Sequence, residues 1–135
     1  MNKNDRKWLK MTLELAKECT HSPTAFCVGA VITDANGQLI STGYSRETDP
    51  KKHAEEIAIE KALKAQHDLT NSTIYSSLEP CGERLSGKKT CVQWIIETGI
   101  NRVVFAEYEP PTFVKGIGEE LLKKANIETF YLALK

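Results

Sequence analysis

Residues 102–134 read RVVFAEYEPPTFVKGIGEELLKKANIETFYLAL, and their pattern sets the fold class. The run 102–106 is short and very apolar, which is typical of a buried strand, and 127–134 is predicted to be the last strand. Residues 119–125 between them have a helical pattern. Because two strands connected through a helix pair in parallel, the last two strands are predicted to be parallel.

Helices and strands alternate through the rest of the chain as well. The turn Asp34-Ala-Asn-Gly37 joins two predicted strands into an antiparallel hairpin, and Gly99 ends a predicted helix. The sequence therefore predicts a single α/β domain over 1–135, a three-layer α/β/α fold around a five-stranded mixed sheet. The remaining predicted helices are 5–19, 53–65 and 91–98, and the remaining strands are 27–33, 38–45 and 73–78.

Composition narrows the class of protein. The 135 residues carry 18 basic and 18 acidic side chains, a balance that argues against binding a nucleic acid polymer. The apolar runs are too short to cross a bilayer, and no apolar block follows the charged N-terminus, so we expect a cytoplasmic protein without a membrane partner. In that compartment, the four cysteines are expected to bind metal or remain free thiols rather than form disulfides.

Two short motifs together supply a set of zinc ligands. His53-Ala54-Glu55 is followed by Pro80-Cys81 and then by Cys91. One histidine and two cysteines leave the fourth tetrahedral position of zinc open for water, which is typical of catalytic rather than structural zinc. Zinc-dependent nucleobase deaminases carry H-x-E…P-C-x-x-C. The first half matches, whereas nine residues rather than two separate Cys81 from Cys91.

The role predicted for Glu55 is proton transfer. Zinc lowers the pKa of its water, so that hydroxide would attack a carbon bearing an exocyclic amine, and Glu55 would carry protons to the ring nitrogen and the departing ammonia. Glu55 itself is not expected to bind zinc. A structural four-ligand site would need another ligand, for which Cys19, Cys27, His21 and His67 are the candidates. The two cysteines are expected in the core and both histidines in solvent.

His53-Ala-Glu55 and Leu78-Glu-Pro-Cys81…Cys91 resemble the cytidine deaminase-like superfamily over nearly the whole chain. The resemblance implies a three-layer α/β/α fold, one Zn²⁺ per subunit and assembly as homodimers or tetramers. Parallel final strands favour the branch of deoxycytidylate, tRNA-adenosine, guanine and riboflavin-pathway deaminases. The strongest resemblance is to the deaminase domain of the bifunctional riboflavin-biosynthesis enzyme, although the loop 82–90 is longer here and lacks that family's histidine.

Five residues are predicted to contact the substrate. Phe26 could form a pocket wall or belong to the core, and Ser45 could hydrogen-bond the substrate. The resemblance implies that the backbone of Ala54 meets the base edge. Arg84, in the loop between the cysteines, could bind a phosphate or carboxylate, as could its neighbours Lys88 and Lys89, or it could simply be solvated. Phe113 could close over the site, anchor its loop or lie in a subunit interface.

The favoured function is zinc-dependent hydrolytic deamination of a small aminated nucleobase, nucleoside or nucleotide, with a cytosine or pyrimidine type of substrate first. The alternatives are the riboflavin-pathway pyrimidine, guanine or another amino-heterocycle. A more remote alternative is a zinc-stabilised binding module without catalysis. That alternative gives no reason for Glu55, whereas the enzyme requires it.

Overall fold

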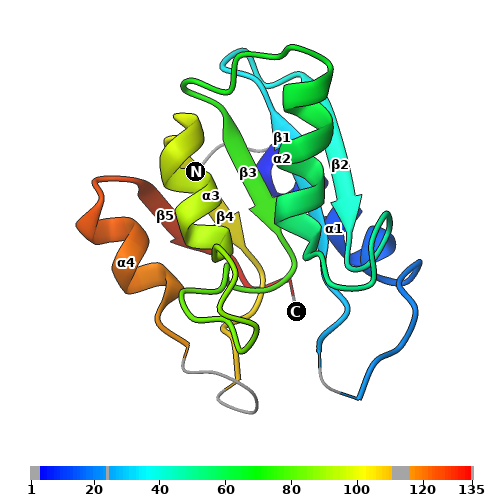
Figure 1. The fold of residues 1–135 in the computed structure, drawn as a ribbon. Coiled ribbons are helices and arrows are strands. Elements are labelled where there is room, and N and C mark those ends of the chain that lie inside the picture. The colour runs from blue at the N-terminus through cyan, green and yellow to red at the C-terminus, as the bar shows by residue number, and fades with distance from the viewer. Residues whose placement is uncertain (1–3, 24, 111–115, 135) are drawn as a thin grey trace.

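The computed structural model describes residues 4–23, 25–110 and 116–134. They form one sheet of five strands in the order β2-β1-β3-β4-β5, with four helices around it (Figure 1). In chain order the elements are α1 (Asn4–Ala16), β1 (Gly29–Thr33), β2 (Leu39–Tyr44), α2 (Ala54–Lys64), β3 (Thr73–Ser76), α3 (Cys91–Thr98), β4 (Arg102–Phe105), α4 (Gly118–Lys124) and β5 (Glu128–Tyr131).

The direction of the strands confirms the predicted mixed sheet. Strand β1 pairs antiparallel with both β2 and β3, whereas β3, β4 and β5 are parallel. Ser76 is level with Phe105, and Phe105 is level with Tyr131. The carboxyl ends of these three strands therefore meet at one edge of the sheet, where sites form in folds of this class.

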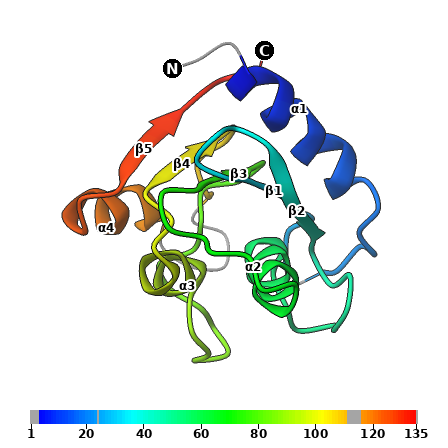
Figure 2. The same cartoon turned by 90° about the horizontal axis from the view of Figure 1, so that it is seen from above.

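Helices cover both faces of the sheet, which confirms the three layers. Figure 2 shows α1 on one face and α2 and α3 on the other, with α4 beside β5. The α1 face is built around Trp8 and Leu9, which pack with Val31 and Val104. The opposite, larger core contains Ile59, Ile95 and Leu122 from the other three helices. Within the described residues, no helix is long and apolar enough to cross a membrane.

Local sequence explains how closely α2 approaches the sheet and where α3 begins and ends. A Cβ atom at Gly43 would lie 2.5 Å from the carbonyl oxygen of Ala54, so only glycine on β2 lets the first turn of α2 come this near. Helix α3 begins with a capping box, in which the Thr90 side chain accepts from the N–H of Gln93 and the Gln93 side chain accepts from the N–H of Thr90. It ends at Gly99, whose φ of 85° is left-handed.

The region after α1 corrects two predictions. The helix was predicted to continue to residue 19 but ends at Ala16, because the next three N–H groups bond three residues back in tight turns. Cys19 and Cys27 were predicted to be free or metal-binding thiols in the core. They are instead half-buried and joined by a disulfide, with their Cα atoms 5.6 Å apart.

Candidate active site

Three predicted metal ligands converge although the first and the last are 38 positions apart in the sequence. Nδ1 of His53 lies 3.6 Å from Sγ of Cys81 and 3.4 Å from Sγ of Cys91. All the ligand atoms lie within 4.8 Å of one another, and no other such group occurs among the residues that the structure describes. One imidazole nitrogen and two thiol sulfurs at this spacing fit zinc, which prefers nitrogen and sulfur donors.

The ends of secondary-structure elements place these ligands. His53 is the N-cap of α2, and Cys91 is the first residue of α3. Cys81 follows β3 and receives the backbone N–H of Cys91 on its sulfur at 3.3 Å, while its carbonyl receives the N–H of Val92 at 3.1 Å. The N-terminus of α3 therefore faces the Cys81 sulfur, where its partial positive charge stabilises a thiolate.

The two thiols share one hydrogen bond, which shifts their pKa values in opposite directions. A hydrogen bond from the Cys91 thiol, with help from His53, lowers the pKa of Cys81 to about 4. The same hydrogen bond, together with complete burial, raises the pKa of Cys91. Cys81 is therefore a thiolate at neutral pH, the form in which cysteine binds metal.

Glu55 lies beside this cluster but is not a member of it. Its side chain is buried, and the hydroxyl of Ser76 donates to its Oε2 at 3.2 Å. Burial, followed by the negative charge of Cys81, raises the pKa of Glu55 to about 7. A carboxyl group that titrates near neutrality can both accept and donate a proton, as general acid–base catalysis requires.

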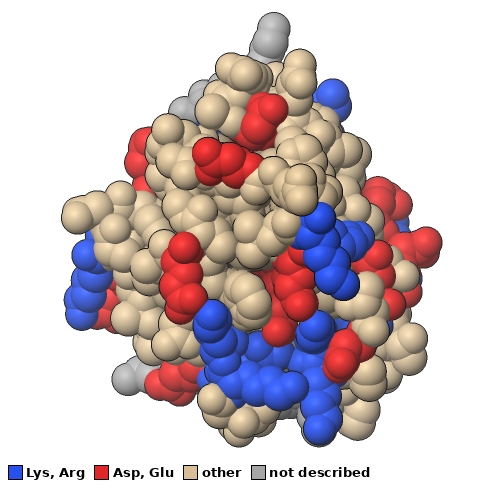
Figure 3. All heavy atoms as spheres, turned by 45° about the horizontal axis from the view of Figure 1, so that its top comes forward, with Lys and Arg blue, Asp and Glu red and all other residues tan. Residues whose placement is uncertain are grey.

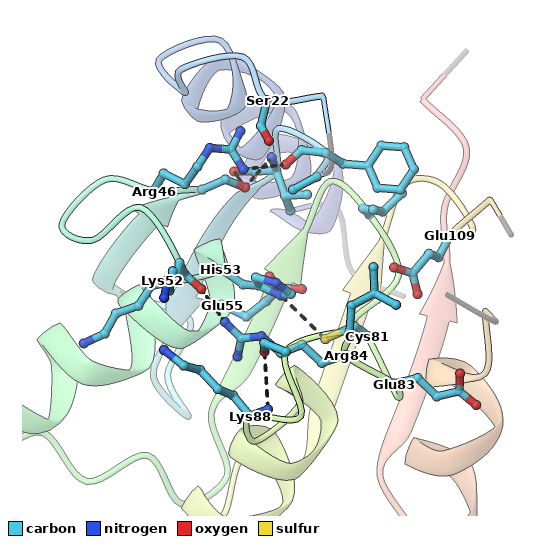
Figure 4. A pocket seen from close by; sticks show the side chains of 18 of the residues that line it. Ser22, Arg46, Lys52, His53, Glu55, Cys81, Glu83, Arg84, Lys88 and Glu109 are labelled. Atoms are coloured by element: carbon cyan, nitrogen blue, oxygen red, sulfur yellow. Dashed lines mark hydrogen bonds between the residues drawn. The ribbon is translucent and has the colours of Figure 1, made fainter. Parts of the chain in front are cut away.

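A pocket of about 580 Å³ opens over these residues, a size that suits a small ligand. Figure 4 shows His53, Glu55 and Cys81 in the middle of its lining, between Ser22 at one end and Arg84 and Lys88 at the other, with Glu109 beyond Cys81. The pocket is lined by Ser22, Ala25, Phe26, Val28, Ser45, Arg46, Pro50, Lys51, Lys52, His53, Glu55, Leu78, Glu79, Cys81, Glu83, Arg84, Leu85, Ser86, Lys88 and Glu109.

The predicted substrate contacts have different surroundings. Phe26 lines the pocket and also packs against the larger core. Ser45 lines it too, while its hydroxyl accepts the N–H of Val28 at 2.9 Å. Ala54 is fully buried in the first turn of α2. Phe113 lies outside the described residues.

Arg84 lines the pocket, yet its guanidinium is bound to protein. It donates to the carbonyls of Lys51 and Lys89 and forms an ion pair with Glu56 at 3.0 Å. Lys89, predicted as a possible anion contact, pairs with Glu97 at 2.7 Å.

Three acidic residues that line the pocket, Glu79, Glu83 and Glu109, were not predicted. Glu109 follows β4 at the same edge of the sheet as Cys81, and its Oε1 is buried without a hydrogen-bond partner among the described residues. Glu79, inside the Leu-Glu-Pro-Cys motif, is buried and accepts the backbone N–H groups of Glu109 and Glu119. Glu109 lies three residues after the predicted apolar strand 102–106, and this place beyond the carboxyl end of a strand was the signal that could have identified it.

The remaining candidates for a fourth ligand lie elsewhere. His21 and His67 are exposed, as predicted, and neither belongs to the group formed by His53, Cys81 and Cys91. Cys19 and Cys27 are bonded to each other. The described residues thus offer three ligands, which leaves a position for water or substrate.

Comparison with known proteins gives consistent similarities. The profile described as "Cytidine and deoxycytidylate deaminase zinc-binding region" matches residues 2–107. The diaminohydroxyphosphoribosylamino-pyrimidine deaminase of Schizosaccharomyces pombe is 47% identical over 92% of this chain and 31% of its own length. The Buchnera aphidicola (from Acyrthosiphon pisum) protein with the same name is 33% identical over 92% of this chain and 81% of its own.

A solved structure is similar over nearly the same extent. The Rib2 deaminase of Aspergillus oryzae, crystallised with DARIPP as a C-terminal deletion mutant, superposes with a TM-score of 0.84 at 29% identity, covering 96% of this chain and 84% of that one. The chain spans about a third of the length of the S. pombe relative.

Proposed function

The chain belongs to the family of cytidine and deoxycytidylate deaminases that carry this zinc-binding region, and we propose that it deaminates a phosphoribosylated diaminopyrimidine of riboflavin biosynthesis. This is the riboflavin-pathway alternative rather than the cytosine-type substrate that the sequence favoured. Support comes from the relatives named for that pyrimidine and from the neighbour crystallised with DARIPP. The observation that carries the reaction is Glu55 in the lining of the pocket, beside the cluster of His53, Cys81 and Cys91.

The reaction replaces an exocyclic amine by oxygen. Zinc held by His53, Cys81 and Cys91 supplies Lewis acidity that makes water a nucleophile near neutral pH. Glu55 takes a proton from the attacking water, whose oxygen bonds to the amine-bearing carbon. Glu55 gives this proton to the ring nitrogen and then carries the remaining proton of the new hydroxyl group to the amine nitrogen, which leaves as ammonia as the C–N bond breaks and the carbonyl forms. Ser76 holds Glu55 in place by donating to its Oε2.

The lining of the pocket suits an aminated base. Phe26 and Val28 provide apolar surface against which a flat ring can lie. Glu109 also lines the pocket, where its carboxyl group could accept a hydrogen bond from an amino group or ring N–H of the base. A pyrimidine with a second amino group would satisfy it.

Lysines at the rim suit a phosphate. Lys51 and Lys88 line the pocket and are exposed, and neither forms an ion pair with another described residue. Figure 3 shows Lys and Arg side chains gathered low on the face in view, among acidic ones, so the zero net charge conceals a local basic patch. Two cations at the mouth of a pocket can hold the phosphate of a phosphoribosyl group.

The test is ammonia release by the purified protein. The phosphoribosylated diaminopyrimidine should be deaminated, and its dephosphorylated form should have a KM at least about tenfold higher if the lysines bind phosphate. Deoxycytidylate, cytosine and guanine should react poorly. Preference for deoxycytidylate would overturn the proposed substrate. If ammonia is released from none of these compounds, the proposal of an enzyme is wrong and a zinc-stabilised binding module is favoured.

Metal analysis tests the site independently of turnover. The protein should contain one zinc per chain, and Cys81→Ala should lose it, whereas His67→Ala should retain it because His67 is exposed and outside the cluster. A wild-type protein without zinc, or a Cys81→Ala protein that keeps it, would contradict the proposed site.

A further inference from the structure

A buried ion pair joins the loop between the two cysteine ligands to α2. Residues 83 and 85–89 of this loop are exposed, yet the Arg84 side chain is only 5% exposed and its partner Glu56 only 9%. Arg84 Nη2 lies 3.0 Å from Glu56 Oε1. A charged side chain directed inward from an exposed loop is uncommon, because desolvation is costly unless the charge is well paired.

Arg84 belongs to the segment of one predicted ligand, and its guanidinium contacts the segments of the other two. Its Nη2 donates to the carbonyl of Lys51 at 2.6 Å, two residues before His53. Its Nη1 donates to the carbonyl of Lys89 at 2.8 Å, two residues before Cys91. Arg84 itself stands three residues after Cys81.

Glu56 extends this network to the backbone of the histidine ligand. Its Oε1, which receives Arg84, also receives the backbone N–H of His53 at 3.3 Å. That contact belongs to the capping box of α2, so the carboxylate also stabilises the start of the helix that presents His53 and Glu55. One buried ion pair therefore joins the two halves of the site.

We propose that Arg84 is a positioning residue that holds the three ligand-bearing segments at the spacing zinc requires. The inference rests on the proposed zinc site. Arginine suits the task because its planar fork offers several donors in fixed directions, whereas lysine offers a single centre. A guanidinium occupied by three protein acceptors is poorly placed to bind a substrate anion, so this role differs from the substrate contact predicted for Arg84.

The rate of zinc release measures this role without relying on catalysis. Zinc-loaded wild type, Arg84→Gln, Arg84→Lys, Glu56→Gln and the Arg84→Gln/Glu56→Gln double variant are mixed with excess coloured chelator. Residues that orient metal ligands typically change metal affinity about 10–100-fold, so Arg84→Gln should release zinc faster by a factor in that range. Arg84→Lys should fall between, and the double variant should release zinc no faster than the faster single variant, because both changes break the same pair.

Thermal unfolding with and without zinc separates positioning from general stabilisation. If Arg84 positions ligands, Arg84→Gln should lower the midpoint of the zinc-loaded protein more than that of the zinc-free protein. Arg6→Gln, an exposed arginine on α1, is the matched control and should change neither midpoint nor zinc release.

Three results would overturn the inference. They are wild-type zinc release by folded Arg84→Gln, equal lowering of both midpoints, or additive effects in the double variant. If Arg84→Gln does not fold, the inference is overturned when Arg84→Lys and Glu56→Gln both release zinc at the wild-type rate. A wild-type protein that takes up no zinc would overturn the proposed function as well, so the two failures are distinguishable.

Discussion

Two neighbouring glutamates show how position decides the role of a residue. Glu55 and Glu56 are both buried in the first turn of α2. Glu55 faces the pocket, where burial raises its pKa to about 7, and the hydroxyl of Ser76 holds it. Glu56 faces the guanidinium of Arg84. The same side chain is thus suited to proton transfer at one position and to structural pairing at the next.

Glu55→Gln should abolish proton transfer without disturbing the metal. The amide has nearly the same shape and can still accept from Ser76, but it cannot accept a proton from water. The value of kcat should fall by about 10³-fold, within the range of general acid–base catalysis. Ammonia release and zinc content measured on the same sample check the prediction, and Glu18→Gln, at an exposed position, is the control. Unchanged turnover would remove Glu55 from the mechanism.

Glu109→Gln should change how stability depends on pH. Burial, with the negative charges of Cys81, Glu55 and Glu79, raises the pKa of Glu109 from 4.5 to about 8. Between these pH values the folded protein holds a proton that the unfolded chain has released, so this group makes stability fall as pH rises through the window. Glutamine has no such proton.

The variant should therefore unfold near the wild-type temperature at pH 5 and at a higher temperature at pH 8.5. Thermal midpoints of zinc-free protein, with thiols kept reduced by a phosphine, provide the measurement. Glu128→Gln is the control at an exposed position. A midpoint difference that is the same at both pH values would contradict the assigned cause.

At the scale of elements, the junctions between them build the site. His53 begins α2, Cys91 begins α3 and Cys81 follows β3. The pocket wall comes from another junction, the loop between α1 and β1, which carries Phe26 and is closed by the Cys19–Cys27 disulfide. The guanidinium of Arg46, which follows β2, donates to the carbonyl of Thr20 in this loop at 2.7 Å. This hydrogen bond fastens the loop to the end of β2.

Replacing both Cys19 and Cys27 by serine should lower the free energy of unfolding. A disulfide that closes a loop of this length is worth about 2–3 kcal/mol, chiefly because it restricts the unfolded chain. Urea unfolding without reductant measures the loss. In addition, unfolded, zinc-free wild type should titrate two thiols before reduction and four after it. Four thiols before reduction would contradict the disulfide.

At the scale of the whole molecule, one buried network fastens α1 to the sheet. Asp5 is fully buried and accepts the hydroxyl of Tyr75 on β3 at 2.7 Å and the guanidinium of Arg102 on β4 at 2.9 Å. Burial, followed by the hydrogen bond to Asp5, raises the pKa of Tyr75 to about 12, so the donor keeps its proton throughout the physiological range. Among the described residues, α1 is the one helix on its face of the sheet, and this network holds it there.

Tyr75→Phe should destabilise the protein while leaving zinc binding unchanged, because the Tyr75 side chain packs with α1, on the face of the sheet opposite α2 and α3. Loss of one hydrogen bond to a buried charged group costs about 1.5–3 kcal/mol. Urea unfolding at pH 7 gives the difference, and Tyr131→Phe, at a 44% exposed position, is the control. Equal stability of both variants would show that the Tyr75 hydroxyl does not support Asp5.

Sequence predicted most of the fold because periodicity and turn residues are local signals. The alternation of elements, the hairpin and the parallel last strands were correct, with element ends shifted by a few residues. Glu109 was missed because its part in the pocket depends on β4 lying beside β3. The disulfide was missed because pairing depends on the 5.6 Å between two Cα atoms and not on cysteine count.

By itself, the sequence determined the α/β class and the set of side chains suited to zinc deamination, because spacing and ligand chemistry are written in the residue order. Only the tertiary structure decided where those side chains point. In the folded protein, the Arg84 side chain points inward and contacts the ligand segments. Glu109 and Glu55 lie on different sides of Cys81, and Cys19 is bonded to Cys27. These outcomes depend on contacts between distant segments, which exist only once the parallel strands bring their carboxyl ends to one edge.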